Sequence, residues 1–151
     1  MSEKILCPYC LSPLEGQRKE CPFCGKSLEN LNPPGTLPFA YLLGSRYTIG
    51  KVLQVDGEGI LYAAVENVSG FRVNIKEYLP VTLSSGRDEN LIVHPKPDSE
   101  VLFKTTRMDF ADLYKTVQRI TPATGLVAVL DVLEANDTVY AVLEVTQGIP
   151  L

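Results

Sequence analysis

The sequence has 151 residues and a mass of 16.6 kDa, enough for one ordinary domain with a small appendage and too short for a two-lobed enzyme. Hydrophobic residues make up 45% and charged residues 21%, a composition typical of a globular protein and unlike that of a disordered or collagen-like chain. The net charge of −4 disfavours binding to nucleic acid or to an anionic membrane surface.

All four cysteines lie near the N-terminus, where they form two Cys-x-x-Cys pairs. Cys7 and Cys10 make the first pair, and Cys21 and Cys24 make the second. A two-residue gap lets one tight turn direct two sulfurs at the same ion, and four thiolates form the closed tetrahedral shell of a structural zinc site. We therefore predict a small zinc ribbon over residues 1–28 that binds one structural zinc ion. Because such a shell has no open position for water, the metal is not expected to be catalytic.

Two other uses of these cysteines stay open from the residues alone. Disulfides are uncommon in the reducing cytoplasm, which is the expected compartment because the N-terminus lacks the apolar stretch of a signal peptide. A redox site is the second, since Cys7-Pro8-Tyr9-Cys10 also has the spacing of glutaredoxin-like proteins. That chemistry needs a βαβ scaffold, which residues 11–20 do not provide, so zinc binding is the preferred interpretation.

Residues 29–40 contain three prolines and one glycine and lack a regular apolar pattern, which is typical of a linker. Two β-prone runs follow, at residues 46–55 and 59–66, and the Asp-Gly turn between them favours a hairpin. A third run covers residues 71–78. The sequence therefore predicts three antiparallel strands in succession. The Pro-, Ser- and Gly-containing residues 80–99, which follow them, are expected to form an irregular insertion.

A helix is expected next, beginning at about Ser99 or Thr106 and ending at Ile120. Its apolar residues recur at helical spacing, and Thr106 with Asp109 fits a capping box.

Two last strands complete the expected fold. Residues 126–135 and 138–145 are β-prone and are joined by an Asn-Asp turn, another hairpin signal. The five strands and the helix predict an α+β domain over residues 41–151, preceded by the small zinc ribbon.

Several blocks of residues 41–151, taken in order, resemble the start of bacterial Ser/Thr protein kinases. These blocks are residues 47–53, 57–64, 73–80, 110–120 and 129–144. The resemblance implies the N-terminal lobe of a kinase, which is a five-stranded antiparallel sheet with one packed helix. This lobe has the same order of strands and helix as the elements predicted above.

The resemblance also implies a nucleotide site. In kinases the backbone of a glycine-rich loop covers the phosphates of ATP, and a strand lysine pairs with them in the presence of magnesium. Gly57 and Gly59 fall on that loop and Lys76 matches the lysine, so these three are the candidate ATP-binding residues. Two of the three motif glycines are replaced, by Gln54 and Asp56. A carboxylate at this place is expected to repel the phosphates and so to weaken the binding of ATP with its magnesium ion.

Further departures concern the surroundings of the lysine. The helix position that holds its glutamate partner in kinases is Leu113, which belongs to the apolar stripe, with Asp109 and Asp112 as nearby substitutes. Asn74 replaces the small alanine that lies against adenine. Lys76 has a simpler interpretation as a half-buried strand lysine whose amine reaches solvent. The catalytic-loop and Asp-Phe-Gly motifs are absent from the sequence, so we expect no phosphoryl transfer by this chain alone.

These observations predict a non-catalytic module, made of a zinc ribbon and a degenerate kinase N-lobe, for protein interaction or regulation. The alternative is the N-terminal ATP-binding part of a longer Ser/Thr protein kinase or pseudokinase. A nucleic-acid adaptor acting through the ribbon is a third hypothesis, which the charge disfavours. Expected partners are another protein, a kinase C-terminal lobe or a second copy of the chain; nucleic acid and membranes are not expected. The one histidine, His94, is expected to have no catalytic role.

Overall fold

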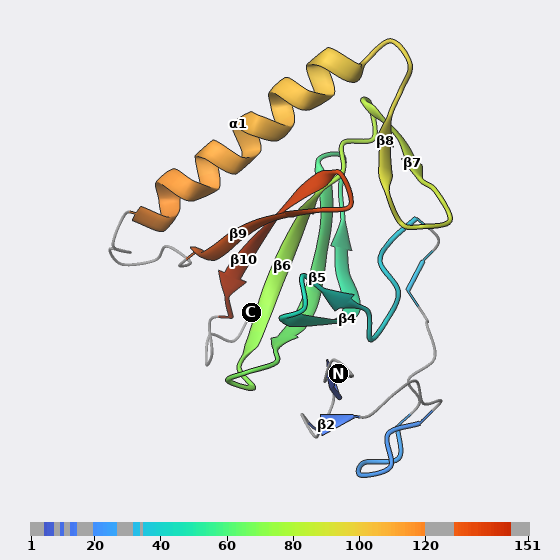
Figure 1. Cartoon of the computed structure of the whole chain (residues 1–151), viewed down its shortest axis with the longest axis vertical. Coiled ribbons are helices and arrows are strands. Elements are labelled where there is room, and N and C mark those ends of the chain that lie inside the picture. Colours follow the sequence, from blue (N-terminus) through green and yellow to red (C-terminus); the bar gives the residue numbers. More distant parts are fainter. Residues whose placement is uncertain are drawn as a thin grey trace.

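The computed structural model describes residues 5–7, 10, 13–14, 20–26, 32–33, 35–119 and 129–145. Its main feature is a curled antiparallel sheet with strand order β3-β4-β5-β6-β10-β9 (Figure 1). In that order the strands are β3 (Leu42–Leu43), β4 (Tyr47–Val55), β5 (Gly59–Glu66), β6 (Arg72–Tyr78), β10 (Thr138–Glu144) and β9 (Val129–Ala135). The helix α1 (Glu100–Arg119) packs on this sheet. The predicted α+β class is therefore confirmed.

The sheet has six strands, so the prediction of a five-stranded sheet is wrong by one strand. The extra strand is β3, whose two residues pair with Thr48 and Tyr47 at the edge of the sheet. A strand of two residues is too short to show the alternation of apolar and polar residues that reveals the longer strands. The first residues of the predicted strand 126–135, at positions 126–128, lie outside the described residues.

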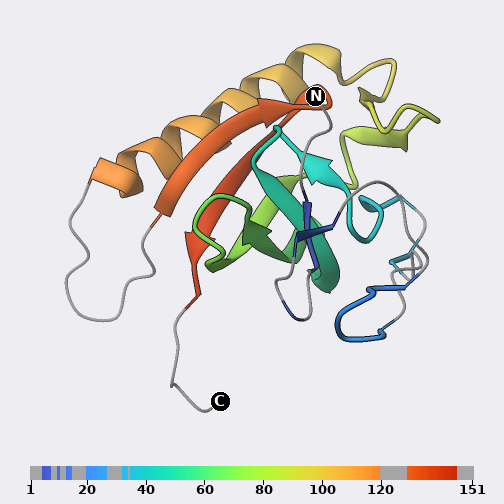
Figure 2. The same ribbon diagram turned by 60° about the horizontal axis from the view of Figure 1, so that its bottom comes forward.

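The helix α1 lies across one face of the sheet, alongside β9 and β10 (Figure 2). Phe103 and Phe110 are buried on its inner side and contact the ring of Tyr78 on β6. The helix begins after Ser99, whose carbonyl accepts the N–H of Phe103, so the earlier of the two predicted starts is confirmed. The predicted capping box is wrong, because Thr106 lies inside the helix and its hydroxyl donates to carbonyls of the preceding turn.

The opposite face of the sheet carries the larger core. Its buried side chains include Leu43, Tyr62, Ile75 and Tyr140, which come from β3, β5, β6 and β10. Leu37, from the segment predicted as a linker, is fully buried in the same core. The two faces of β6 therefore have different surroundings: Val73, Ile75 and Glu77 face this core, whereas Asn74, Lys76 and Tyr78 face the side on which α1 lies.

Residues 80–99 contain regular structure, contrary to the predicted irregular insertion. Strands β7 (Ser84–Arg87) and β8 (Val93–Pro95) form an antiparallel pair. The turn between them is organised by Asp88, whose carboxylate accepts the N–H groups of Asn90 and Ile92. Gly86 has a φ of 105° and pairs with His94, and the register shifts between Ser84 and Gly86, so this short pair of strands is irregular.

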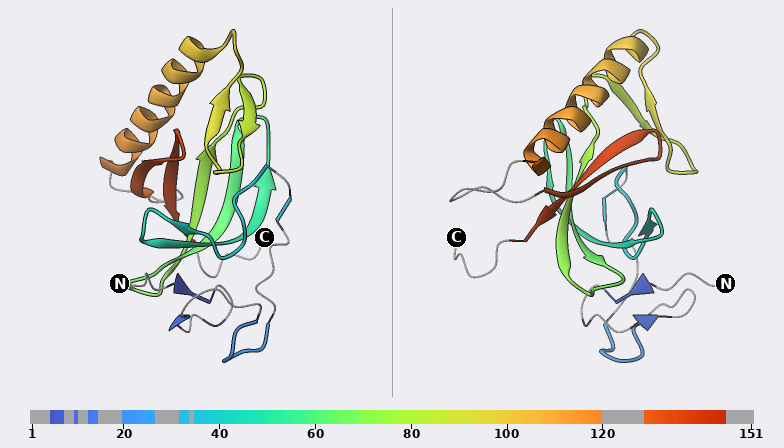
Figure 3. Two further views of the ribbon diagram at one scale, coloured as in Figure 1. Left: turned by 45° about the vertical axis from the view of Figure 1, so that its right-hand side comes forward. Right: turned by 60° about the vertical axis from the view of Figure 1, so that its left-hand side comes forward.

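The described N-terminal segments lie at the end of the molecule opposite α1, as Figure 1 and both views of Figure 3 show. They include a small antiparallel sheet of β1 (Ile5–Leu6) and β2 (Pro13–Leu14). Within the described ranges, no helix combines the length and the apolar character needed to cross a membrane.

Candidate functional site

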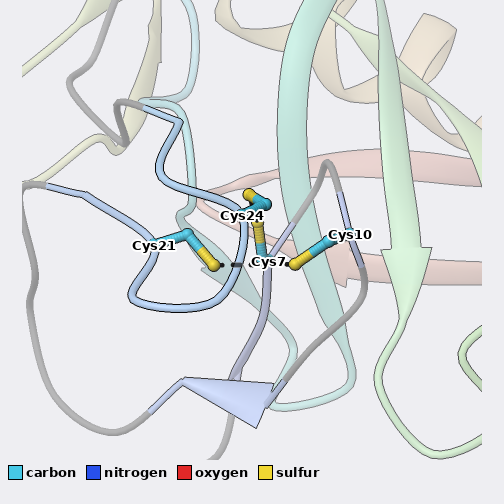
Figure 4. Close-up of side chains that lie close together, drawn as sticks. All are labelled: Cys7, Cys10, Cys21 and Cys24. Atoms are coloured by element: carbon cyan, nitrogen blue, oxygen red, sulfur yellow. Dashed lines mark hydrogen bonds between the residues drawn. The ribbon is translucent and has the colours of Figure 1, made fainter.

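The four cysteines come together in one cluster, with their sulfurs directed at a common centre (Figure 4). Cys7 directly follows β1 and is buried, as is Cys21, whereas Cys10 and Cys24 are exposed. The second pair sits in a tight knuckle, where the N–H of Gly25 donates to the carbonyl of Cys21 at 2.9 Å. Gly25 has a φ of 75°, a left-handed backbone conformation that glycine adopts without strain.

The spacing of the sulfurs fits a tetrahedral metal ion. All four lie within 4.8 Å of one another, with 3.8 Å between Cys7 and Cys24 and 3.6 Å between Cys10 and Cys21. Four sulfurs at about 2.3 Å from a tetrahedral zinc ion would be about 3.8 Å apart. A disulfide would bring two sulfurs to about 2.05 Å. The four cysteines lie close together and could bind a metal ion such as zinc, as the sequence spacing predicts.

The turn between β4 and β5 is held by hydrogen bonds to the carboxylate of Asp56, which is one of its own residues. Asp56 Oδ1 accepts the N–H groups of Glu58 and Gly59, each at 2.9 Å. These two hydrogen bonds lower the pKa of Asp56, and the one from Gly59 has the larger effect, so the carboxylate is charged at neutral pH. The other side of the turn is held as well, because the carbonyls of Glu58 and Gly57 accept the N–H groups of Leu79 and Val81, at 3.0 and 3.1 Å.

The two candidate glycines of this turn differ in the space that a side chain would have at their positions. A Cβ at Gly59 would lie 1.9 Å from the carbonyl oxygen of Glu77 on β6, so only glycine permits this approach of the two strands. A Cβ at Gly57 would meet nothing within 4 Å. Gly59 therefore has a packing role between β5 and β6.

Lys76 points to the turn rather than to the helix. Its ammonium nitrogen lies 3.9 Å from Oε1 of Glu58, and its side chain is 22% exposed. On α1, Asp109 and Asp112 are exposed, and none of the ion pairs among the described residues joins Lys76 to either. Leu113, predicted to belong to the buried stripe, is 58% exposed, so that prediction is wrong.

The structure also contains a buried polar network that the sequence reasoning missed. Glu77 is fully buried, and its carboxylate accepts hydrogen bonds from Tyr62 at 2.8 Å, from Tyr140 at 2.5 Å and from both terminal nitrogens of Arg87. Burial raises the pKa of both tyrosines. Burial alone would lower the pKa of Arg87, but the hydrogen bonds with Glu77 outweigh it and raise that pKa. The sequence does contain one signal of this network, because a glutamate stands two residues after Ile75 at a position of β6 that faces the core.

His94 lies on β8 with an exposed side chain. Its ring nitrogen Nε2 is 2.7 Å from Asp88 Oδ2, and this hydrogen bond is the main cause that lowers the pKa of Asp88. The histidine thus belongs to the β7–β8 turn.

Comparison with known proteins finds similar solved structures. No protein-family model matches the sequence, and neither does any curated protein sequence. Among solved structures, the apo form of PpkA-294, from a bacterial Ser/Thr kinase, is similar, with a TM-score of 0.69 and 25% sequence identity. The match covers 76% of this chain and 40% of that chain, so this chain spans less than half of the PpkA structure. The sheet and helix described above therefore have a kinase-like fold.

Proposed function

We propose that this chain is a non-catalytic module in which a zinc ribbon and a degenerate kinase N-lobe serve protein interaction or regulation. The observation that carries the proposal is the β4–β5 turn, where Asp56 accepts the N–H groups of Glu58 and Gly59. In protein kinases the backbone of the corresponding turn covers the phosphates of the nucleotide. Here these two amide groups are already bonded to a carboxylate of the chain itself.

Charge adds to this effect. ATP would bring its phosphates close to two carboxylates, those of Asp56 and Glu58. Two like charges at 4 Å repel each other by about 1 kcal/mol in bulk water and by about 4 kcal/mol near a protein surface. Both side chains belong to an exposed turn, so screening keeps the cost of each contact near the lower value. Several such contacts together would still weaken nucleotide binding.

Lys76 is the cation that would offset this repulsion. Its ion-pair partner is Glu58 of the same turn, and α1 carries the exposed Leu113 where a kinase has its glutamate. In the proposal, Lys76 is a structural residue that ties β6 to the turn, and Gly57 and Gly59 shape a hairpin instead of a phosphate loop.

The cysteine cluster would hold one structural zinc ion. Cys7, Cys10, Cys21 and Cys24 would fill the tetrahedral shell, so the ion would stabilise the ribbon without taking part in a reaction. A segment of this length cannot bury a sizeable core, and metal binding would supply about 10 kcal/mol or more of its folding free energy. The partner of the module would be another protein, a second copy of the chain or a kinase C-terminal lobe.

A second candidate function is the N-terminal ATP-binding part of a longer Ser/Thr protein kinase. Two observations favour it: the chain covers 40% of the PpkA-294 structure, and Lys76 lies on the face of the sheet where α1 packs. Binding of ATP, with magnesium, to Gly57, Gly59 and Lys76 is what distinguishes this candidate from the first.

The test is the change in melting temperature on addition of magnesium and ATP, measured for the full chain and for Lys76→Ala. A ligand at a hundred times its Kd stabilises a protein by about 2.7 kcal/mol, which a thermal melt detects readily. We expect no shift in either protein at millimolar ATP. A saturable upward shift in the full chain that Lys76→Ala removes would reject the non-catalytic proposal and support the second candidate.

A further inference from the structure

A cavity of about 400 Å³ lies where the cysteine-bearing segment meets the sheet. Lys26, two residues after Cys24, forms one side, and Phe39, which packs against Cys7 and Cys21, forms another. The remaining wall comes from β4, β5 and β6. A volume of this size is within the range of sites for small molecules, about 300 to 1,000 Å³.

Three cations surround this cavity. They are Lys26, Lys51 on β4 and Arg72 on β6, which come from three separate parts of the chain. None of the described residues that line the cavity is acidic. The chain as a whole is acidic, with a net charge of −4, so the presence of three basic side chains at one cavity is a local feature.

The cavity is distinct from the surroundings of Lys76. In the register of β5 and β6, Leu61 pairs with Lys76 and Val65 pairs with Arg72. Side chains four residues apart on a strand share a face and lie about 13 Å apart along it. Arg72 and Lys76 therefore face the same side of the sheet, but one small phosphate group cannot contact both.

We propose that this cavity binds a small phosphate monoester with an apolar group. The phosphate would lie among Lys26, Lys51 and Arg72, since a guanidinium pairs with two phosphate oxygens and the ammonium groups add charge. The apolar group would lie against Phe39 and the small side chains of β5, of which Ala63 and Val65 line the cavity. The three cations and the apolar wall together favour this ligand over a free inorganic anion.

Binding depends on the cysteine cluster. The N–H of Cys21 donates to the carbonyl of Lys26 at 3.0 Å, so the knuckle fixes the backbone that carries this lysine. Phe39 is 8% exposed, and the buried cysteines in contact with it are Cys7 and Cys21. Loss of the metal would leave Lys26 and Phe39 without a fixed position, so the affinity for the ligand should fall when the metal is removed. This step rests on the proposed metal site.

The test is a titration of the zinc-loaded full chain with phenyl phosphate and, separately, with inorganic phosphate. Binding is measured by calorimetry and by the changes in amide chemical shifts. We expect one phenyl phosphate per chain, with shifts at Lys51 and Arg72, and weaker binding of inorganic phosphate. Lys51→Ala and Arg72→Ala should each weaken phenyl phosphate about fivefold, as for a solvent-exposed ion pair. Lys104→Ala, which removes an exposed cation from α1, is the matched control and should change nothing.

Several results would overturn the proposal. These are unsaturable binding, equal affinity for phenyl phosphate and inorganic phosphate, or affinities that are unchanged in both Lys51→Ala and Arg72→Ala. Lys76→Ala should leave phenyl phosphate binding intact, and a loss there would place the ligand at the kinase-like turn instead. After removal of zinc by a chelator, unchanged affinity would reject the coupling to the cysteine cluster. A shift of melting temperature with ATP that Lys76→Ala removes bears only on the proposed function.

Discussion

Replacing Glu77 by alanine is expected to destabilise the protein more than any substitution of an exposed carboxylate. Glu77 is fully buried and the side chain of Arg87 is 3% exposed, so the substitution leaves a buried guanidinium without its counter-ion. The hydroxyl groups of Tyr62 and Tyr140 lose their acceptor as well. Removing one partner of a buried ion pair typically costs about 3 to 5 kcal/mol. In a domain of this size the melting temperature should fall by about 10 °C or more.

The assay is urea unfolding followed by circular dichroism, because the chain has no tryptophan. Glu134→Ala is the matched control, since Glu134 is exposed on β9, and should cost less than about 0.5 kcal/mol. In a double-mutant cycle, Glu77→Leu with Arg87→Leu should cost less than the sum of the single substitutions. A loss below about 1 kcal/mol for Glu77→Ala, the level of a surface ion pair, would refute the reasoning.

Three other predictions concern the turn, a tyrosine and the metal. Gly59→Ala should lower the free energy of unfolding by about 2 kcal/mol or more, because its Cβ would meet a backbone carbonyl of β6, whereas Gly57→Ala should be close to neutral; equal losses in urea unfolding would contradict the packing role. Burial and then Asp131 raise the pKa of Tyr47 to about 12, so its contribution to stability is complete below the unfolded pKa of about 10 and is lost as the pH rises to about 12. Tyr47→Phe should flatten this alkaline decline in urea midpoints, and an unchanged slope would be inconsistent with the shift. Chelation should release one zinc ion per chain and direct proteolysis to residues 1–28 while residues 41–145 persist; a chain that carries no metal as purified would reject the ribbon.

Much of the sheet could be predicted because its signals are local. Runs of β-prone residues mark β4, β5, β6, β9 and β10, and short polar turns join β4 to β5, β5 to β6 and β9 to β10. The cysteine cluster was equally accessible, since two Cys-x-x-Cys pairs close together leave few arrangements other than one shared centre. The start of α1 near Ser99 also followed from the helical spacing of apolar residues.

What could not be predicted depends on contacts between distant parts of the chain. Leu113 has the helical spacing of a core residue, but α1 packs on β9 and β10 in a way that leaves Leu113 exposed. Arg87 lies in a segment rich in serine and glycine, and only the folded chain brings it to Glu77. Asp56 was interpreted as a charge that would repel a phosphate, whereas its hydrogen bonds to the amides of its own turn require the backbone geometry.

Residues between the cysteine cluster and the sheet are attached to the sheet by hydrogen bonds. Asn32 donates to the carbonyls of Leu37 and Gly50 and accepts the N–H of Val52, while Arg87 reaches across to the carbonyl of Gly35. A shortened variant that starts at residue 41 would lose the buried side chain of Leu37. Tyr62 and Arg87 would each lose one hydrogen-bond partner, the N–H of Leu37 and the carbonyl of Gly35. Phe39 of the same segment packs against Cys7 and Cys21, so a protein bound at the cysteine cluster would contact a part of the chain that is anchored to the sheet.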